Sequence, residues 1–133
     1  MDLFTAMDIS ASGMRAQRTR MNIISSNIAN ANTTRTAEGG PYRRRDVIFR
    51  ENSFEQELSS VEVEDIVEDP AQGNRIFDPG NPDADEDGYV TMPNVNIMEE
   101  MVDMVGATRA FEANTAAIKA QKDMALKALS IGR

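Results

Sequence analysis

The sequence predicts a mainly α protein in which two long terminal helices pack as a coiled-coil-like antiparallel pair, with a small β-rich central insertion. Apolar residues recur at alternating spacings of four and three near both ends of the 133-residue chain, which places them on one stripe of a helix. All five Pro and five of the eight Gly lie between these ends, where they interrupt helices. We therefore expect an N-terminal coiled-coil helix in residues 1–35, an acidic β-rich segment in residues 36–93 and a C-terminal coiled-coil helix in residues 94–133.

The first helix is expected from about Leu3 to Ala31. Such a helix is about 43 Å long at ~1.5 Å per residue, too long for a narrow apolar stripe to be buried within one small domain. It therefore needs a partner along its length. The apolar members of its stripe are Met7, Met14, Met21, Ile24 and Ile28.

The second helix is expected to begin after Asn96, whose side chain can cap it while Glu99 reaches back as in a capping box. Glu99, Glu100 and Asp103 in its first turns favour the helix macrodipole, and Gly132 marks its end. The apolar members of its stripe are Ile97, Met101, Met104, Phe111, Ile118 and Leu129. We call the apolar members of both stripes the seam and expect them to carry assembly.

Polar residues interrupt both stripes, so the free subunit is expected to bury too little surface to order both ends, and order should come with assembly. Two helical glycines, Gly13 and Gly106, each cost about 1 kcal/mol relative to Ala and are expected where the helices approach closely. The interrupting residues are Ser10, Gln17, Thr108, Thr115 and Lys122.

The central segment is expected to form three or four short strands. Val47 and Phe49 alternate with polar residues, as do Val61 and Val63, and two further β-like pieces lie near residues 75–77 and 88–90. Gly and Pro turns separate these pieces, so they predict a small appendage with few core residues.

Composition excludes several classes of function. The net charge of −8 opposes binding to nucleic acid, and the absence of Cys and His removes thiolate chemistry, most zinc sites and the commonest general base. Asp2 and Asp8 stand where a secretory signal would have basic residues. We therefore expect no catalysis, cofactor, small-molecule substrate or nucleic-acid partner, and no export by the general secretory route.

Asp83, Asp85, Asp87 and Gly88 match the opening of an EF-hand calcium loop. Position 12 of that loop should be a bidentate Glu and is Asn94. A calcium site and a solvated acidic turn are the alternatives, and the incomplete ligand set favours the turn.

Two basic clusters also have alternative interpretations. Residues 43–45 are three consecutive Arg, for which pairing with acidic residues within or between subunits is favoured over nucleic acid. Arg15, Arg18 and Arg20 on the first helix are compatible with an anionic membrane surface. The matching stripe of the second helix favours a protein partner for that helix instead.

Residues 27–33, Asn-Ile-Ala-Asn-Ala-Asn-Thr, resemble the N-terminal signature of the bacterial flagellar rod and hook protein family. Residues 95–104 and 107–114 resemble the C-terminal signature of the same family. The residues that carry the resemblance are Asn27, Ile28, Ala29, Asn30, Asn32 and Thr33 in the first motif, and Asn96, Glu99, Glu100, Met101, Arg109, Phe111 and Asn114 in the second.

Most family members continue the first motif with Pro-Gly-Tyr, whereas this chain has Thr-Arg-Thr at residues 34–36. That departure and the short central segment resemble the C-type proximal rod class rather than the B-type class or the larger distal rod and hook proteins. The resemblance implies a structural subunit of the basal-body rod, the shaft that crosses the periplasm and transmits rotation from motor to hook.

The resemblance also implies the partners: other copies of the chain, the B-type, F-type and G-type rod subunits and the rod-to-MS-ring adaptor. It implies export through the flagellar type III apparatus, without a cleaved signal peptide. A soluble coiled-coil adaptor or chaperone is the alternative from another class, although its seam would be more uniformly Leu or Ile.

Overall fold

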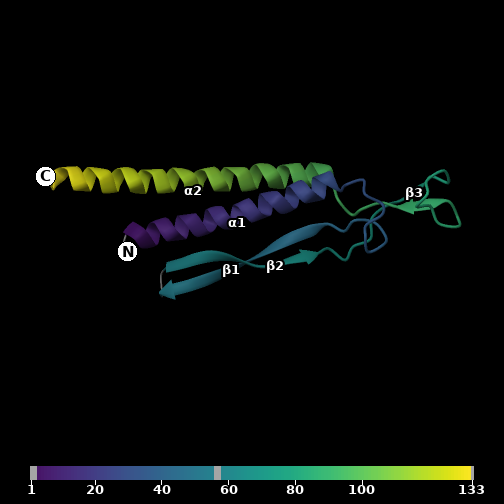
Figure 1. Cartoon of the computed structure of the whole chain (residues 1–133), viewed down its shortest axis with the longest axis horizontal. Coiled ribbons are helices and arrows are strands. Elements are labelled where there is room, and N and C mark those ends of the chain that lie inside the picture. The colour runs from purple at the N-terminus through teal and green to yellow at the C-terminus, as the bar shows by residue number, and fades with distance from the viewer. Residues whose placement is uncertain (1–2, 56–57, 133) are drawn as a thin grey trace.

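The computed structural model describes residues 3–55 and 58–132 (Figure 1). In chain order, one helix precedes four strands and a second helix follows them, so the prediction of a mainly α protein with a central β insertion is confirmed. Asp2, one of the two acidic residues that disfavour a secretory signal, lies outside the described residues. The elements are α1 (Leu3–Ala29), β1 (Arg45–Glu55), β2 (Leu58–Glu68), β3 (Arg75–Phe77), β4 (Tyr89–Thr91) and α2 (Ile97–Ile131).

The two helices lie side by side with opposed chain directions (Figure 1). Thr108 Oγ1 lies 3.6 Å from the sulfur of Met21, and Thr115 Oγ1 lies 3.9 Å from the sulfur of Met14. Later residues of α1 therefore meet earlier residues of α2. With 35 residues against 27, α2 extends beyond the start of α1 at its C-terminal end (Figure 1).

The two helical glycines differ in surroundings. A Cβ at Gly13 would lie 2.9 Å from the amide nitrogen of Asn114, so the close approach predicted there is confirmed. The same prediction is wrong for Gly106, which is exposed and would bring its Cβ within 4 Å of nothing. Gly106 lies on a face of α2 that points away from α1.

β1 and β2 form an antiparallel hairpin that lies along α1, on the side of α1 away from α2 (Figure 1). Each strand has 11 residues, so the expectation of short strands is wrong for this pair. Ser12 of α1 supplies the reason, because its hydroxyl accepts a hydrogen bond from the Val61 amide at 3.1 Å. Contact with α1 gives the hairpin a partner along its length.

The short strands β3 and β4 pair antiparallel and form the tip of the molecule, residues 75–91, beyond the C-terminal end of α1 (Figure 1). Phe77 and Tyr89 pack edge to face with ring centroids 5.2 Å apart, and the Arg75 guanidinium lies 5.0 Å from the centre of the Tyr89 ring. Gly88 adopts φ +82°, a conformation that favours glycine, and completes the turn before β4.

The buried core is thin, and three of its side chains are polar. Fully or nearly buried positions are Ala16, Ile24, Ala31, Tyr42, Val90 and Ala107, together with Ser12, Asn27 and Glu100. The side chain of Asn96 caps α2 by accepting from the Met98 amide at 3.1 Å. Among the described helices, none combines the length and the apolar character that a membrane span requires.

Candidate functional site: a polar junction and an apolar groove

Asn27 is the centre of a buried polar junction where the end of α1 meets the start of β1 and the first turn of α2. Its side chain is 0% exposed. The amide nitrogen donates to the Arg45 carbonyl at 2.8 Å and to Glu100 Oε2 at 3.0 Å. The amide oxygen accepts from the Tyr42 hydroxyl at 2.9 Å and from the Arg45 amide at 3.0 Å. All four hydrogen-bonding positions of this amide are therefore used.

Glu100 places a fully buried carboxylate in the same junction. Its Oε1 accepts from Arg44 Nε at 2.5 Å, and Arg44 also lies within 4 Å of Asp46 and Asp103. Partial burial alone would lower the pKa of Arg44. The hydrogen bond and charge of Glu100 and the charge of Asp46 together outweigh this effect, so the pKa of Arg44 is raised above its ordinary value. The buried pair therefore holds both charges in place.

Asn94 ties the two ends of the β1–β2 hairpin to the chain entering α2. Its side-chain oxygen accepts from the Arg44 amide at 2.8 Å, and its nitrogen donates to the carbonyls of Asp69 and Ala71 at 3.2 and 3.0 Å. Two buried or half-buried Asn side chains thus fix the orientation of both helices and the hairpin. This junction is structural, since it holds backbone groups that would otherwise be unpaired.

The sequence prediction missed this pairing, because Glu100 was assigned to the macrodipole of α2. A signal existed: Glu100 is in step with Met104, Ala107 and Phe111, so it lies on the apolar stripe rather than on the solvent face. Asn27 follows Ile24 by three residues and lies on the buried side of α1 for the same reason.

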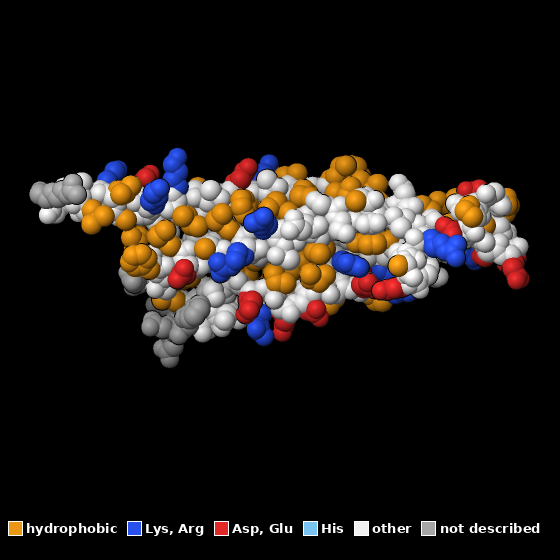
Figure 2. Space-filling view, in the orientation of Figure 1, with side chains coloured by type: hydrophobic (Ala, Val, Ile, Leu, Met, Phe, Trp, Pro, Cys, Tyr) orange, Lys and Arg blue, Asp and Glu red, His pale blue; other side chains and the backbone are white. Residues whose placement is uncertain are grey.

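The second feature is an apolar groove of about 710 Å³ between α1 and α2. Two Arg of α1, Arg15 and Arg18, lie at this groove, and hydrophobic side chains gather along the helix pair with basic ones among them (Figure 2). We call this feature the groove. The seam residues that line it are Met14, Met21, Met104, Phe111 and Ile118.

The remaining seam residues are distributed over other environments. Ile24 is buried, and Met7 and Ile28 are half-buried. Three others are exposed, namely Ile97 (38%), Met101 (49%) and Leu129 (70%). One subunit therefore leaves much of its seam in solvent.

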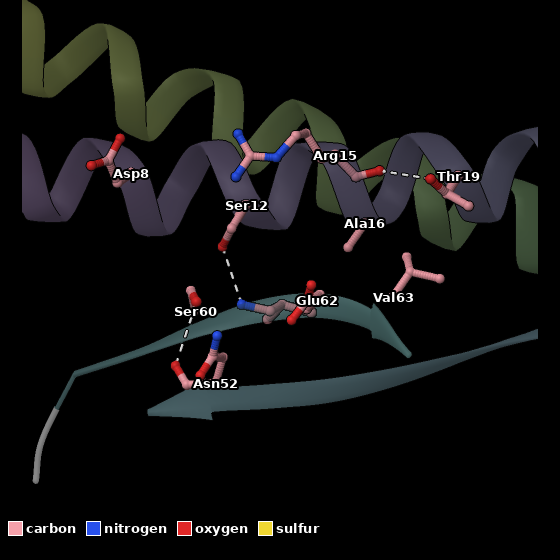
Figure 3. Close-up of a pocket in the computed structure, with 10 residues that line it drawn as sticks. Asp8, Ser12, Arg15, Ala16, Thr19, Asn52, Ser60, Glu62 and Val63 are labelled. Atoms are coloured by element: carbon pink, nitrogen blue, oxygen red, sulfur yellow. Dashed lines mark hydrogen bonds between the residues drawn. The ribbon is translucent and has the colours of Figure 1, made fainter. Parts of the chain in front are cut away.

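The third feature is a mostly polar hollow between α1 and the hairpin. Ser12 and Ala16 of α1 point toward β2, with Asp8 one turn before Ser12 and Arg15 between Ser12 and Ala16 (Figure 3). The small side chains of Ser12 and Ala16 are 4% and 3% exposed and let the hairpin approach. Ser12 and Ala16 are four residues apart and therefore lie on the same face of α1, which was the sequence signal available for this contact.

The carboxylates of the acidic turn at the tip accept hydrogen bonds from neighbouring groups of the same chain. Asp83 accepts from the Thr34 hydroxyl at 2.7 Å, and Asp85 accepts from the amides of Asp87 and Tyr89 and from Arg75. The hydrogen bond from the Tyr89 amide, together with Arg75, holds the pKa of Asp85 below its ordinary value. Within residues 3–55 and 58–132, no cluster of three acidic side chains suits a metal ion.

The predicted pairing of the Arg run with acidic residues is confirmed for two of its members. Arg44 pairs with Glu100, and Arg45 lies 3.8 Å from Glu68. Arg43 is exposed.

Both ends of the chain match family models of known proteins. Residues 7–35 match the family model described as flagella basal body rod protein, and residues 86–131 match the one described as flagellar basal body rod FlgEFG protein, C-terminal. The flagellar basal-body rod protein FlgC of Bacillus subtilis is 43% identical, with 100% of both chains covered. The chain belongs to the flagellar basal-body rod protein family.

FlgC proteins of other bacteria agree with this assignment. The Yersinia enterocolitica protein is 40% identical with 100% of both chains covered, and the Aquifex aeolicus protein is 45% identical over 93% of this chain and 92% of that protein. The family resemblance predicted from residues 27–33 and 95–114 is therefore confirmed.

The residues that carried the resemblance occupy several roles in this rod-family structure. Asn27 and Glu100 build the junction, and Asn30 donates to the Ser26 carbonyl at 2.8 Å while its oxygen accepts from Thr33. Asn96 caps α2, and Phe111 and Asn114 face α1 or the groove. The others are half-buried Ile28 and exposed Ala29, Asn32, Glu99, Met101 and Arg109.

Proposed function

We propose that the chain is a structural subunit of the proximal rod of the flagellar basal body, which assembles helically through its terminal helices and transmits motor torque to the hook. Its role is structural rather than catalytic. The observation that carries the proposal is the full-length similarity to FlgC proteins, at 43% identity over 100% of both chains for one relative. The exposed part of the seam supplies the surface that assembly would bury.

The terminal helices are the proposed assembly elements. The opposed contacts from Gly13–Asn114 to Asn27–Glu100 support packing as an antiparallel coiled-coil-like pair. Exposed Met101 and Leu129 and the open groove leave apolar surface for neighbouring subunits. Burial of apolar surface contributes about 25 cal/mol per Å², so rod assembly would stabilise both helices.

The proposed organisation keeps the three segments expected above, with residues 1–35 and 94–133 in the rod wall and residues 36–93 as the acidic insertion. The proposed location is the periplasmic part of the basal body, reached through the flagellar export apparatus without cleavage of a signal peptide. The proposed partners are other copies of the chain and the B-type, F-type and G-type rod subunits, with the rod-to-MS-ring adaptor at the base.

The test is to express the tagged chain in its own flagellated cell and isolate detergent-washed basal bodies. We expect the protein to copurify with them, and we expect deletion of its gene to stop rods from forming. A protein that stays in the cytoplasm, in cells whose rods are intact without it, would support the coiled-coil adaptor instead.

A further inference from the structure

The tip carries apolar side chains that the rest of the subunit does not cover. Ile76 is 51% exposed, Phe77 63% and Tyr89 40%. Phe77 and Tyr89 pack against each other, and Phe77 also lies against Gly88, since a Cβ at Gly88 would lie 3.0 Å from the Phe77 ring. Ordered, exposed aromatic side chains are typical anchors of protein interfaces.

Acidic residues lie close to these aromatic residues in the chain. Asp78, Glu86 and Asp87 are exposed, and none of them forms an ion pair with a described basic residue. The basic Arg75 at the tip is already paired with Asp85. The free charge of the tip is therefore negative, and Figure 2 shows acidic side chains beside its hydrophobic group.

The groove has the complementary properties. Its volume of about 710 Å³ falls within the range of ~300–1,000 Å³ typical of binding pockets, and Met14, Met21 and Phe111 make its lining apolar. Arg15 and Arg18 border it, and neither forms an ion pair with an acidic side chain in the described part of the chain. The free charge at the groove is therefore positive.

One subunit cannot bring its own tip into its own groove. The groove is lined by residues between 11 and 25 of α1 and between 104 and 118 of α2. The tip lies beyond the C-terminal end of α1 (Figure 1). A contact between them requires two molecules. Because the two surfaces are different, the contact is head to tail and leaves a free tip and a free groove at the ends of every chain of subunits.

We infer that the tip of one copy, with Phe77 and Tyr89 as anchors, docks into the groove of a second copy, where Arg15 and Arg18 face its acidic residues. This inference rests on the proposed function and names one contact within the assembly. Opposite charges at the rim would select the partner and its orientation, while the aromatic side chains would supply buried apolar area.

Introduced cysteines test this contact cleanly, because the chain contains no Cys. The variant Ile76→Cys/Asn22→Cys places one thiol on the tip and one at the groove. Expressed in place of the natural chain, it should give disulfide-linked dimers and longer linked oligomers in oxidised basal bodies. The control Ile76→Cys/Val102→Cys, with a 69% exposed position on another face of α2, should give none.

The outcomes separate this inference from the proposed function. If the double variant is present in basal bodies without a linked dimer, or if the control is linked equally well, the docking of tip into groove is wrong and the rod assignment stands. If the natural chain is absent from basal bodies, the proposed function fails and this inference fails with it.

A charge exchange tests the role of the rim. In the Ile76→Cys/Asn22→Cys background, Arg18→Glu should lower the yield of linked dimer about tenfold, since it places like charges opposite each other. Adding Glu86→Arg should restore the yield. An unchanged yield with Arg18→Glu, or no restoration by the second change, would contradict the proposed charge pairing and overturn the inference.

Discussion

The substitution Asn27→Ala removes the centre of the polar junction. It deletes four hydrogen bonds, two made by the amide nitrogen and two by the amide oxygen. At a net value of ~1 kcal/mol each, their loss destabilises the subunit by about 4 kcal/mol. Because a domain of this size has a total stability of about 5–15 kcal/mol, this is a large fraction.

The assay is urea unfolding of the purified subunit, followed through Tyr42. The chain has two Tyr and no Trp, so a Tyr89→Phe background leaves Tyr42 as the single reporter, and this residue is 7% exposed beside Asn27. With a slope of ~2 kcal/mol per molar urea, Asn27→Ala should lower the midpoint by about 2 M.

The matched control is Asn22→Ala, the same exchange at an exposed position of α1. Substitutions at exposed positions usually change stability by less than ~0.5 kcal/mol. If Asn27→Ala shifts the midpoint no more than this control does, the junction is not the stabilising element inferred from its geometry.

Three further tests address other contacts. Arg44→Met leaves the Glu100 carboxylate buried without its cation and should cost about 3–5 kcal/mol in urea unfolding, part of which Glu100→Gln restores; no recovery would argue against a buried charge. Gly106→Ala should raise Tm by about 4 °C, whereas Gly13→Ala, which meets a neighbouring side chain, should not, and equal shifts would contradict the packing. Because the pKa of Asp85 is lowered in the folded state, its contribution to stability is present above its unfolded pKa and disappears as pH falls below about 4. An NMR titration of the Asp85 carboxyl carbon would show an ordinary pKa if the tip were not ordered.

The helices were predictable because their signal is periodic and local. Alternating spacings of four and three located both of them, and the N-cap at Asn96 set the start of α2. The predicted end of α1 at Ala31 was two residues too late, since the chain leaves the helix after Ala29 toward the turn that brings Tyr42 to Asn27.

The junction and the long hairpin were not predictable in the same way, because they depend on residues far apart in the chain. Asn27 and Glu100 are separated by 73 positions, and Ser12 and Val61 by 49. Spacing indicates which face of a helix a residue occupies, but it does not identify the residue that lies opposite. For this reason Glu100 was predicted to favour the macrodipole of α2, and its buried partners Asn27 and Arg44 were not predicted.

The groove was predictable only in part. Its lining by Met14, Met21 and Phe111 follows from the predicted seam, whereas its opening to solvent follows from the small number of residues that cover it. A seam that two helices could close would have suited a soluble adaptor. An open seam suits a subunit that needs neighbours.

The central claim is that the seam carries assembly into the rod, and one measurement tests it most directly. Cells that express the natural chain together with a tagged Met14→Asp or Phe111→Asp variant would be used, and the ratio of the two proteins in isolated basal bodies measured by mass spectrometry. The control is Ala113→Asp, which places the same charge at an exposed position of α2 two residues from Phe111. We predict that the seam variants are excluded from basal bodies while the control enters them. Incorporation of Met14→Asp and Phe111→Asp at the level of the natural chain would contradict the account.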